Sequence, residues 1–282
     1  MNLRPIFKDN AYEYYDFMDP DVAENLGRRF FRGLAAHDPD DDHILSLLIW
    51  ELKAVEDLRD TESEIKWIYS DDASSIPSVL DEYHKEAESE EVEKTVFEFP
   101  SLDEEIISTL SDCDFTIAKT ESRNLCVTVD ECRSLSLARK SAPLFIQSIE
   151  DLDSQEFFQG MMNILFRFDD PSPDDIAYLP KEWYDQTVSC CTKTDGKVTG
   201  LFLVHATPSG ILVPVMFYAV GPDSRRNLLD MMRFSIHRAA ENYSGDTIIR
   251  IHRRNNPVLD LTQRLFPDKK GDPAISGNRK ES

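Results

Sequence analysis

"VMFYAVGPDSRRNLLDMMRFSIHRAAENY", residues 215–243, passes from an apolar strand through a loop into a helix. Apolar residues recur every three or four positions from 223 to 243, which predicts an amphipathic helix there. The loop, residues 221–227 ("GPDSRRN"), places two arginines at the helix start, where positive charge opposes the helix dipole unless an anion lies beside it. The stretch therefore predicts either an anion-binding loop or a solvated turn whose arginines are neutralised by Asp223 and Asp230.

The charge of the chain is concentrated in one half. Of 282 residues with a net charge of −22, residues 1–133 carry 13 Lys/Arg against 34 Asp/Glu, and residues 134–282 carry 18 against 19. The first half should repel nucleic acid and anionic membranes, and we expect neither as a partner. No apolar stretch approaches the ~20 residues of a membrane span. Only the second half suits a ligand that bears phosphate.

Cysteine and histidine give little sign of a reactive or metal-binding site. The five cysteines are an odd number without C-x-x-C spacing, so we expect no disulfide framework, no metal site and a cytoplasmic location. Cys190 and Cys191 are candidate nucleophiles, but buried, inert thiols are the favoured interpretation. His205 is either a base at a cleft or, as favoured, a strand histidine whose ring is hydrogen-bonded within the fold.

The order of elements repeats along the chain. The first half reads as strands at 43–54, 63–70, 94–100 and 124–130, with helices at 74–89 and 101–115. The second half reads as strands at 196–210, 211–220 and 246–253, with helices at 223–243 and 256–266. Matching elements are about 150 residues apart, as Tyr69 is from Ala219. A duplication with domains at 1–133 and 134–282 is therefore predicted.

Three segments fall outside the repeat. Residues 137–168 read as a connecting strand plus helices, and residues 169–175 ("DDPSPDD") as a proline-punctuated acidic loop. The tail, residues 268–282, has little apolar content. We expect it to be mobile or to wrap over the second domain.

The order strand–strand–strand–helix–strand–helix–strand resembles the GNAT superfamily of acyl-CoA-dependent N-acetyltransferases. The resemblance implies an α/β fold of two tandem GNAT-like domains, each a mixed, splayed β-sheet flanked by helices. It also implies that the long strand 215–220 leads into a loop and helix that hold the CoA pyrophosphate. The next strand, 246–253, would splay away and leave a V-shaped cleft for pantetheine.

This resemblance gives a cofactor, acetyl-CoA or CoA, and a set of binding residues. These are Tyr218, Ala219, Val220, Gly221, Arg225, Arg226, Asn227 and Asn255. Loops of the family usually read Gln/Arg-x-x-Gly-x-Gly/Ala, because backbone amides must approach the pyrophosphate closely. Arg225 falls near the basic position, whereas Arg226 and Asn227 stand where small residues are expected. The matching loop of the first half carries Asp71 and Asp72, so residues 1–133 are not expected to bind CoA.

No catalytic residue can be assigned. The resemblance implies a general base, often a glutamate acting through water, and a tyrosine that protonates the leaving thiolate. Thr262 or Gln263 stands at the place of that tyrosine, and residues 215–220 contain no carboxylate. Tyr218 either reaches the cleft or, as favoured, packs in the core.

Three functions remain open. The first is an acetyl-CoA-dependent N-acetyltransferase whose second domain transfers the acyl group directly to a small or peptidic amine, cationic because the first domain is acidic. The alternative is a catalytically inactive GNAT-like module that recognises a ligand or protein partner in the inter-domain groove. The third is a different α/β binding fold whose element order matches by coincidence. Whether the protein is an enzyme, and its oligomeric state, stay open.

Overall fold

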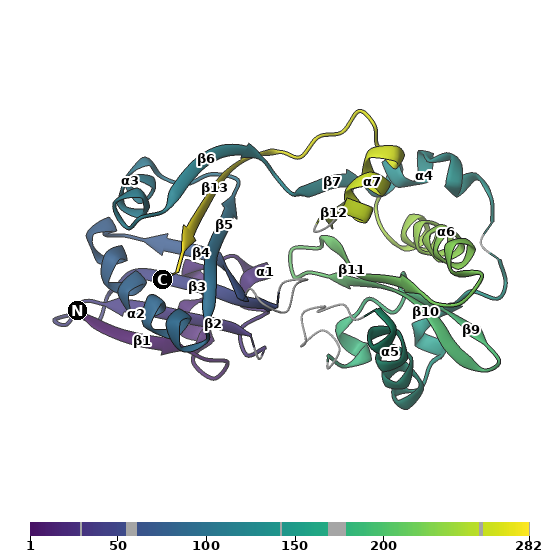
Figure 1. Ribbon diagram of the computed structural model, residues 1–282, viewed down its shortest axis with the longest axis horizontal. Helices are drawn as coiled ribbons and strands as arrows, with labels where there is room; N and C mark the ends of the chain where they lie inside the picture. The colour runs from purple at the N-terminus through teal and green to yellow at the C-terminus, as the bar shows by residue number, and fades with distance from the viewer. Residues whose placement is uncertain (29, 55–60, 142, 169–178, 254–255, 282) are drawn as a thin grey trace. The chain divides into compact units, whose positions relative to one another are not determined.

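The chain forms two compact units in this computed structural model (Figure 1). Unit 1 comprises Met1–Ser122 and Pro273–Ser282, and unit 2 comprises Arg123–Asp272. The structure describes every residue except 29, 55–60, 142, 169–178, 254–255 and 282. The loop expected at 169–175 therefore lies outside the described residues.

Unit 1 is built on a mixed sheet with the strand order β1-β2-β3-β4-β5-β13-β6, in which β4 and β5 pair in parallel and the other described pairs are antiparallel. Helices α2 (Ile76–Ser89) and α3 (Glu104–Asp112) cover one face of it. The short helices η1 (Ala11–Phe17) and α1 (Pro20–Ala23) cover the other face. The strands are β1 (Asn2–Ile6), β2 (Phe31–His37), β3 (Ile44–Ala54), β4 (Thr61–Ser70), β5 (Val92–Phe99), β6 (Thr116–Glu121) and β13 (Pro273–Lys280).

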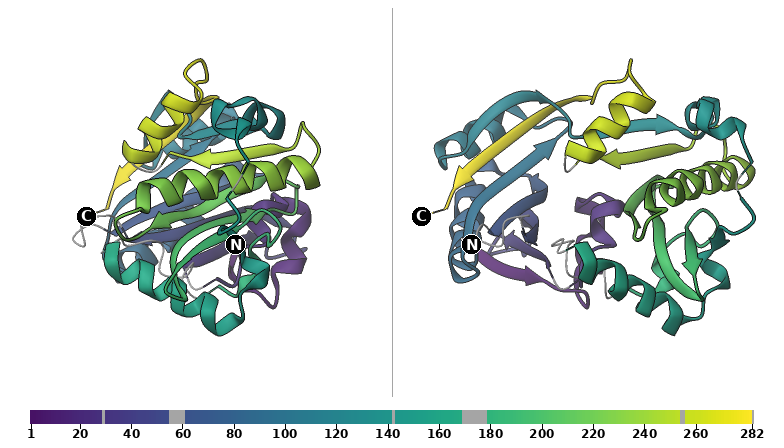
Figure 2. Two further views of the ribbon diagram at one scale, coloured as in Figure 1. Left: turned by 90° about the vertical axis from the view of Figure 1, so that its right-hand side faces the viewer. Right: turned by 45° about the vertical axis from the view of Figure 1, so that its right-hand side comes forward.

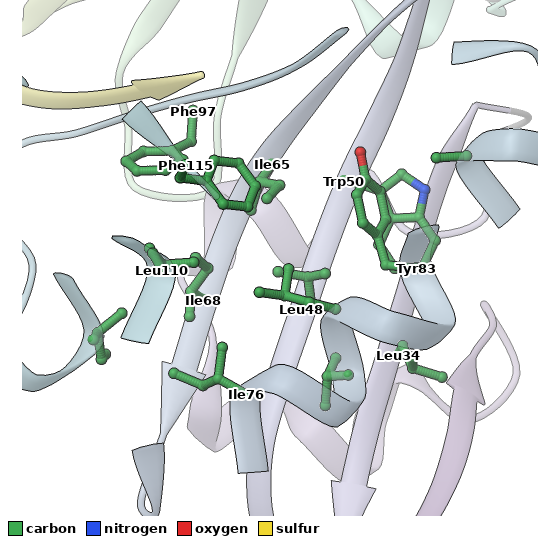
Figure 3. Close-up of a cluster of buried hydrophobic side chains, with 14 of the residues drawn as sticks. Leu34, Leu48, Trp50, Ile65, Ile68, Ile76, Tyr83, Phe97, Leu110 and Phe115 are labelled. Atoms are coloured by element: carbon green, nitrogen blue, oxygen red, sulfur yellow. The ribbon is translucent and has the colours of Figure 1, made fainter. Parts of the chain in front are cut away.

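The core under α2 follows the apolar pattern of the sequence. Ile76, Val79, Leu80 and Tyr83 form the expected face of the helix, and all four are buried. Tyr83 packs edge-on against Trp50 of β3, with 5.1 Å between ring centroids (Figure 3). Burial of each such side chain contributes about 1.5–3 kcal/mol, so this face fixes α2 on the sheet.

Unit 2 is built on a second mixed sheet with the order β7-β12-β11-β10-β9-β8, in which β11 and β12 are parallel. Helix α5 (Ser154–Phe168) packs on one face and helix α6 (Ser224–Asn242) on the other. The strands are β7 (Asn124–Thr128), β8 (Gln147–Ser148), β9 (Cys190–Thr194), β10 (Lys197–Ala206), β11 (Leu212–Ala219) and β12 (Ile248–His252). The remaining helices are α4 (Val129–Ser134), η3 (Ser136–Arg139), η4 (Ile149–Asp151), η6 (Lys181–Trp183) and α7 (Asn256–Leu265).

The parallel strands of each unit separate along their length. In unit 1 the β4–β5 pairing ends at Ile65 and Phe97, and in unit 2 the β11–β12 pairing consists of Leu212 and Ile249. Both long strands also carry a β-bulge, because Lys66 of β4 and Val215 of β11 are extra residues in the ladder with the preceding strand. These bulges lie 149 residues apart in the sequence. Matching splay and matching bulges confirm the predicted tandem duplication and its α/β fold class.

The two units exchange their last strands. Strand β7, which was expected to close the first half, pairs with β12 in unit 2. Strand β13 pairs with both β5 and β6 in unit 1 (Figures 1 and 2). The units therefore differ from the expected division at 1–133 and 134–282, because each sheet takes one strand from the other half of the chain.

The expectation that the tail is mobile or wraps over the second domain is wrong. Residues 273–280 form β13, whose backbone is hydrogen-bonded on both sides. Only Ala274 of β13 is a buried hydrophobic residue, so side-chain hydrophobicity gave no sign of a central strand. Ladder hydrogen bonds on two edges hold the segment instead.

Candidate functional site

The candidate site begins where β11 ends. The Val220 amide donates to the Thr199 carbonyl at 2.8 Å, which keeps the chain beside β10. Gly221 then has φ +95°, and a Cβ built there meets no atom within 4 Å. The glycine is required by the backbone conformation and not by crowding, because this φ is strained for an L side chain. The reversed chain leads directly into α6, with the Ser224 amide donating to the Gly221 carbonyl at 3.2 Å.

The first turn of α6 is open. Asp223 is the N-cap residue, but its side chain makes no capping hydrogen bond. Pro222 has no N–H, and the amides of Arg225 and Arg226 donate to no carbonyl among the described residues, whereas those of Ser224 and Asn227 do. The exposed side chain of Arg225 makes no hydrogen bond or ion pair with the part of the chain that the structure describes. Amides at the positive end of a long helix, with an unpaired guanidinium beside them, form an anion-binding arrangement.

Arg226 differs from its neighbour. Its Nε lies 3.7 Å from Oδ2 of Asp230, one helical turn onward, although the Arg226 side chain is largely exposed. Asp230 is buried and also pairs with Arg233. The interpretation of arginines neutralised by acidic neighbours therefore describes Arg226, and Asp223 forms no such pair in the described chain. Asn227 lies partly buried in the first turn, where its amide donates to the Asp223 carbonyl at 2.9 Å.

The matching turn of unit 1 is closed by its own carboxylate. Asp72 accepts the Ser74 amide at 3.0 Å and the Ser74 hydroxyl at 2.9 Å. Asp71 lies 3.0 Å from His43 and adds a second negative charge. The side chain of Asp72 occupies the place an external anion would take at this helix start. The two halves thus share a fold and differ in the chemistry of the same turn.

The remaining predicted residues fall into three groups. Tyr218 is partly buried and packs against the α5-side core, so its favoured interpretation as a packing residue agrees with its contacts. Ala219 is buried on the α6 side, and Val220 is partly buried at the strand end. Asn255 lies outside the described residues.

Gly200 of β10 was not singled out from the sequence, yet it helps to position the turn. A Cβ at Gly200 would lie 3.2 Å from the Ala219 Cβ, 3.0 Å from the Met231 Cε and 2.7 Å from the Thr192 Oγ1. The glycine therefore lets α6 approach the sheet immediately behind the end of β11. A lone glycine within a predicted strand was the available signal.

The candidate nucleophile and base are not exposed to a substrate. Cys190 and Cys191 are both fully buried, and burial raises the pKa of Cys191 to about 11 and that of Cys190 well above its ordinary value. His205 is buried, its Nδ1 lies 2.8 Å from the Trp183 carbonyl, and its ring stacks on the Trp183 ring at 3.7 Å between centroids. The burial of both thiols and the contacts of His205 agree with the favoured interpretations, inert thiols and a strand histidine that has its own partner.

Other features of unit 2 do not coincide with the turn. Hollows of about 390 and 420 Å³ lie along α7 and beside the second half of α6, and neither is lined by residues 218–227. The described residues contain no cluster of His, Cys, Asp and Glu that could hold a metal ion. Among the same residues, no helix is both long enough and apolar enough to span a membrane.

No family model matches the chain, and no curated protein matches it in sequence. Solved structures do match its fold. A tandem GNAT protein from the clavulanic acid biosynthesis pathway covers 100% of this chain and 98% of its own, with 8% identity and a TM-score of 0.60. A GCN5-related N-acetyltransferase from Kribbella flavida covers 98% and 96%, with 11% identity and a TM-score of 0.51. The glucosamine N-acetyltransferase region of a fungal multi-domain GH3 β-N-acetylglucosaminidase covers 99% of this chain and 38% of that one, with 9% identity and a TM-score of 0.58. Together with the splayed, bulged sheets, these matches show that the chain has the GNAT fold in tandem duplication.

Proposed function

We propose that unit 2 binds acetyl-CoA and transfers its acetyl group directly to an amine. The observation that carries the proposal is the open start of α6 after a splayed, bulged strand, with Arg225 exposed beside it. The same turn in unit 1 is filled by Asp72, so the proposal assigns the cofactor to unit 2 alone. The similar structures described as N-acetyltransferases support this class of reaction at the level of the fold.

The residues of unit 2 would hold two parts of the cofactor, its pyrophosphate and its pantetheine chain. The amides of the first turn of α6 and the guanidinium of Arg225 would bind the pyrophosphate. Past Leu212, the described residues of β12 do not pair with β11, so peptide groups of residues 213–217 on that edge can pair with the amide groups of an extended pantetheine chain. Acetyl-CoA supplies an activated thioester, and the bulge at Val215 turns backbone groups out of the ladder beside it.

A second candidate, a binding module without catalysis, is favoured by one observation. From Val213 to Ala219, β11 contains no carboxylate or histidine that could take a proton from the amine. Thr262 or Gln263 stands where the family places the tyrosine that protonates the leaving thiolate; Thr262 is buried and donates its hydroxyl to the Val258 carbonyl at 2.9 Å, and Gln263 is exposed. Catalysis would therefore need a base from another part of the chain or from the substrate.

Calorimetric titration with acetyl-CoA tests cofactor binding. We expect the native chain to bind, and Arg225→Gln to weaken binding by about 3- to 10-fold, because one exposed charge contact is removed. Arg226→Gln should weaken it less, since Asp230 already competes for that guanidinium. Lys197→Gln, on an exposed β10 residue outside the turn, is the charge-matched control. A native chain that does not bind acetyl-CoA would overturn the proposal.

Turnover separates the two candidates. We expect the native chain to consume acetyl-CoA in the presence of primary amines. The measurement is the release of free thiol with each amine of a panel. Binding of acetyl-CoA with no turnover of any amine would instead favour the module without catalysis.

A further inference from the structure

Arg250 of β12 is a charged residue at the point where the strands separate, and it has no partner among the residues that the structure describes. It directly follows Ile249, whose pairing with Leu212 is the contact between β12 and β11. Its side chain is partly buried, and it makes no hydrogen bond or ion pair with the described part of the chain. A guanidinium removed in part from water without a counter-ion is costly, which points to a missing anion.

The face on which Arg250 lies follows from its neighbours. Ile249 and Ile251 pack into the cores on the α6 side, so Arg250 between them points to the opposite face. On β11, Val215 and Tyr218 pack on that opposite, α5 side. Arg250 therefore lies on the same face of the sheet as the bulge at Val215. Arg225 and the open turn belong to α6, which packs on the other face.

The surroundings of Arg250 within the sheet carry no negative charge. Cys126 of β7 lies directly across from it, and Asn124 and Thr128 are the diagonal neighbours on the same face. His252, two residues onward on that face, has its Nδ1 2.8 Å from Asn124 Oδ1. Among the described strand residues of this face, an anion thus meets a guanidinium, an imidazole and neutral polar groups.

Arg250 is also at a suitable distance from the bulge. Leu212 pairs with Ile249, so Val213 lies beside Arg250 and Val215 lies two residues further along β11. With about 3.3 Å per residue and about 4.8 Å between paired strands, the Cα atoms of Arg250 and Val215 are at least about 8 Å apart, and the separation of β11 and β12 past Leu212 adds to this. One small molecule can span that distance with an amine at the bulge and an anionic group at the guanidinium.

We propose that Arg250 is a specificity-determining residue that binds the carboxylate of an amino-acid acceptor and directs its amine toward the bulge at Val215. A planar guanidinium suits a carboxylate, to which it donates two parallel hydrogen bonds. The inference rests on the proposed function and narrows its acceptor to amines that carry a carboxylate. In the reaction the amine nitrogen forms a bond to the acetyl carbonyl carbon and the thioester C–S bond breaks. The amine loses one proton and the departing sulfur gains one, so that the products are the amide and the free thiol of CoA.

The test compares acceptors that differ only in the carboxylate. Acetylation of L-amino acids and of the corresponding amino-acid amides is measured for the native chain, Arg250→Gln and Arg250→Lys. Arg264→Gln, on exposed α7, removes the same charge elsewhere in unit 2 and serves as the control. We expect Arg250→Gln to lower kcat/KM for the acids about 10- to 100-fold, mainly through KM, and to leave the amides unchanged. Arg250→Lys should restore part of the loss.

A binding measurement covers the case without turnover. In the presence of CoA, N-acetyl-L-amino acids should raise the melting temperature of the native chain more than their amides do, and Arg250→Gln should remove the difference. Equal behaviour of acids and amides, or equal loss for both in Arg250→Gln, would overturn the inference while acetyl-CoA binding still supports the proposed function. Absence of acetyl-CoA binding by the native chain would overturn both. Unchanged acetyl-CoA affinity of Arg250→Gln shows that unit 2 remains folded.

Discussion

Arg225 and Arg226 are adjacent in the sequence, but α6 gives their side chains different surroundings. One turn along the helix from Arg226 lies Asp230, and the helical spacing brings these two charges within 3.7 Å. Arg225 has no acidic residue at the matching position, where Leu229 stands. The anion-site interpretation therefore applies to Arg225, and the interpretation as a neutralised turn applies to Arg226.

Asp230 provides a stability prediction at this scale. It is buried and paired with Arg233, and its Oδ2 has no hydrogen-bond partner among the described residues. Replacing it with asparagine keeps the shape but leaves Arg233 without its counter-charge. We expect Asp230→Asn to lower the free energy of unfolding of unit 2 by roughly 1–3 kcal/mol.

Hydrogen exchange of the α6 amides measures this loss, because it reports on unit 2 without requiring both units to unfold together. The control is Asp223→Asn, whose carboxylate is exposed and makes no capping bond. Equal exchange in Asp230→Asn and the native chain would contradict the prediction.

Strand β13 is held by side chains at its end as well as by its ladder. Glu281 Oε1 accepts the Thr95 hydroxyl at 2.6 Å, and Oε2 lies 3.2 Å from the His84 Nδ1. The Tyr83 hydroxyl lies 2.7 Å from the Thr95 oxygen, and Arg279 contacts the other nitrogen of His84. A network of polar side chains therefore ties the end of the chain to α2 and β5.

This network predicts a pH dependence. Burial raises the pKa of Glu281, but the contacts with His84 and Thr95 outweigh it and hold the pKa below its usual value of 4.5. A carboxyl whose pKa is lower in the folded state stabilises that state above about pH 4.5 and loses this contribution as the pH falls further. The protection of the β5 amides, taken relative to the intrinsic exchange rate at each pH, should therefore fall between about pH 5 and pH 3 more in the native chain than in Glu281→Gln. An identical pH dependence of the two chains would contradict this assignment.

Gly277 of β13 gives a steric prediction for the same strand. A Cβ at this position would overlap the ring of Phe97 on β5. Gly277→Ala should therefore displace Phe97 or the strand, at a cost of about 1–3 kcal/mol to unit 1. The neighbouring substitution Ser276→Ala, on the other face of β13, is the control, and hydrogen exchange of the β5 amides is the measurement. Equal exchange rates in the two variants would show that the sheet absorbs the methyl group without strain.

The elements that the sequence predicted are those with a strong apolar period. The strand at 43–54, the helix at 74–89 and the helix at 223–243 appear as β3, α2 and α6 with ends shifted by at most three residues. Strand β13 could not be found in this way, since its residues pair through the backbone and bury little apolar surface. The bulge at Val215 and the position of Arg250, which has no partner within the described ranges of the chain, depend on register, which one strand alone does not encode.

At the scale of the whole molecule, the exchange of strands leaves the difference in net charge between the two parts of the chain almost unchanged. With the structural division, unit 1 carries 13 Lys/Arg and 33 Asp/Glu, and unit 2 carries 18 and 20. The net charges, −20 and −2, reproduce the contrast seen between the two halves of the sequence. Duplication has thus given two copies of one fold, of which one is strongly acidic with a carboxylate in its turn and the other is nearly neutral with that turn open.

Because β13 completes the sheet of unit 1, its removal should affect the two units unequally. In a chain that ends at Asp272, β5 and β6 lose their shared neighbour, and both strand edges become unpaired. We expect the amides of β5 and β6 to lose their protection from hydrogen exchange, while those of β10 and α6 keep it. Acetyl-CoA binding, proposed for unit 2, should persist in the shortened chain.

A synthetic peptide of residues 273–282 provides the matched rescue, since it can re-enter between β5 and β6 as an added strand. Restored protection in β5 and β6 would show that the exchange of strands places the end of the chain in unit 1 through backbone pairing. The same peptide with Gly277 replaced by valine should fail, because its side chain would overlap Phe97. Native-like protection of β5 and β6 in the shortened chain without peptide would instead mean that unit 1 forms its sheet independently of the last strand, and that the tail is dispensable for the fold.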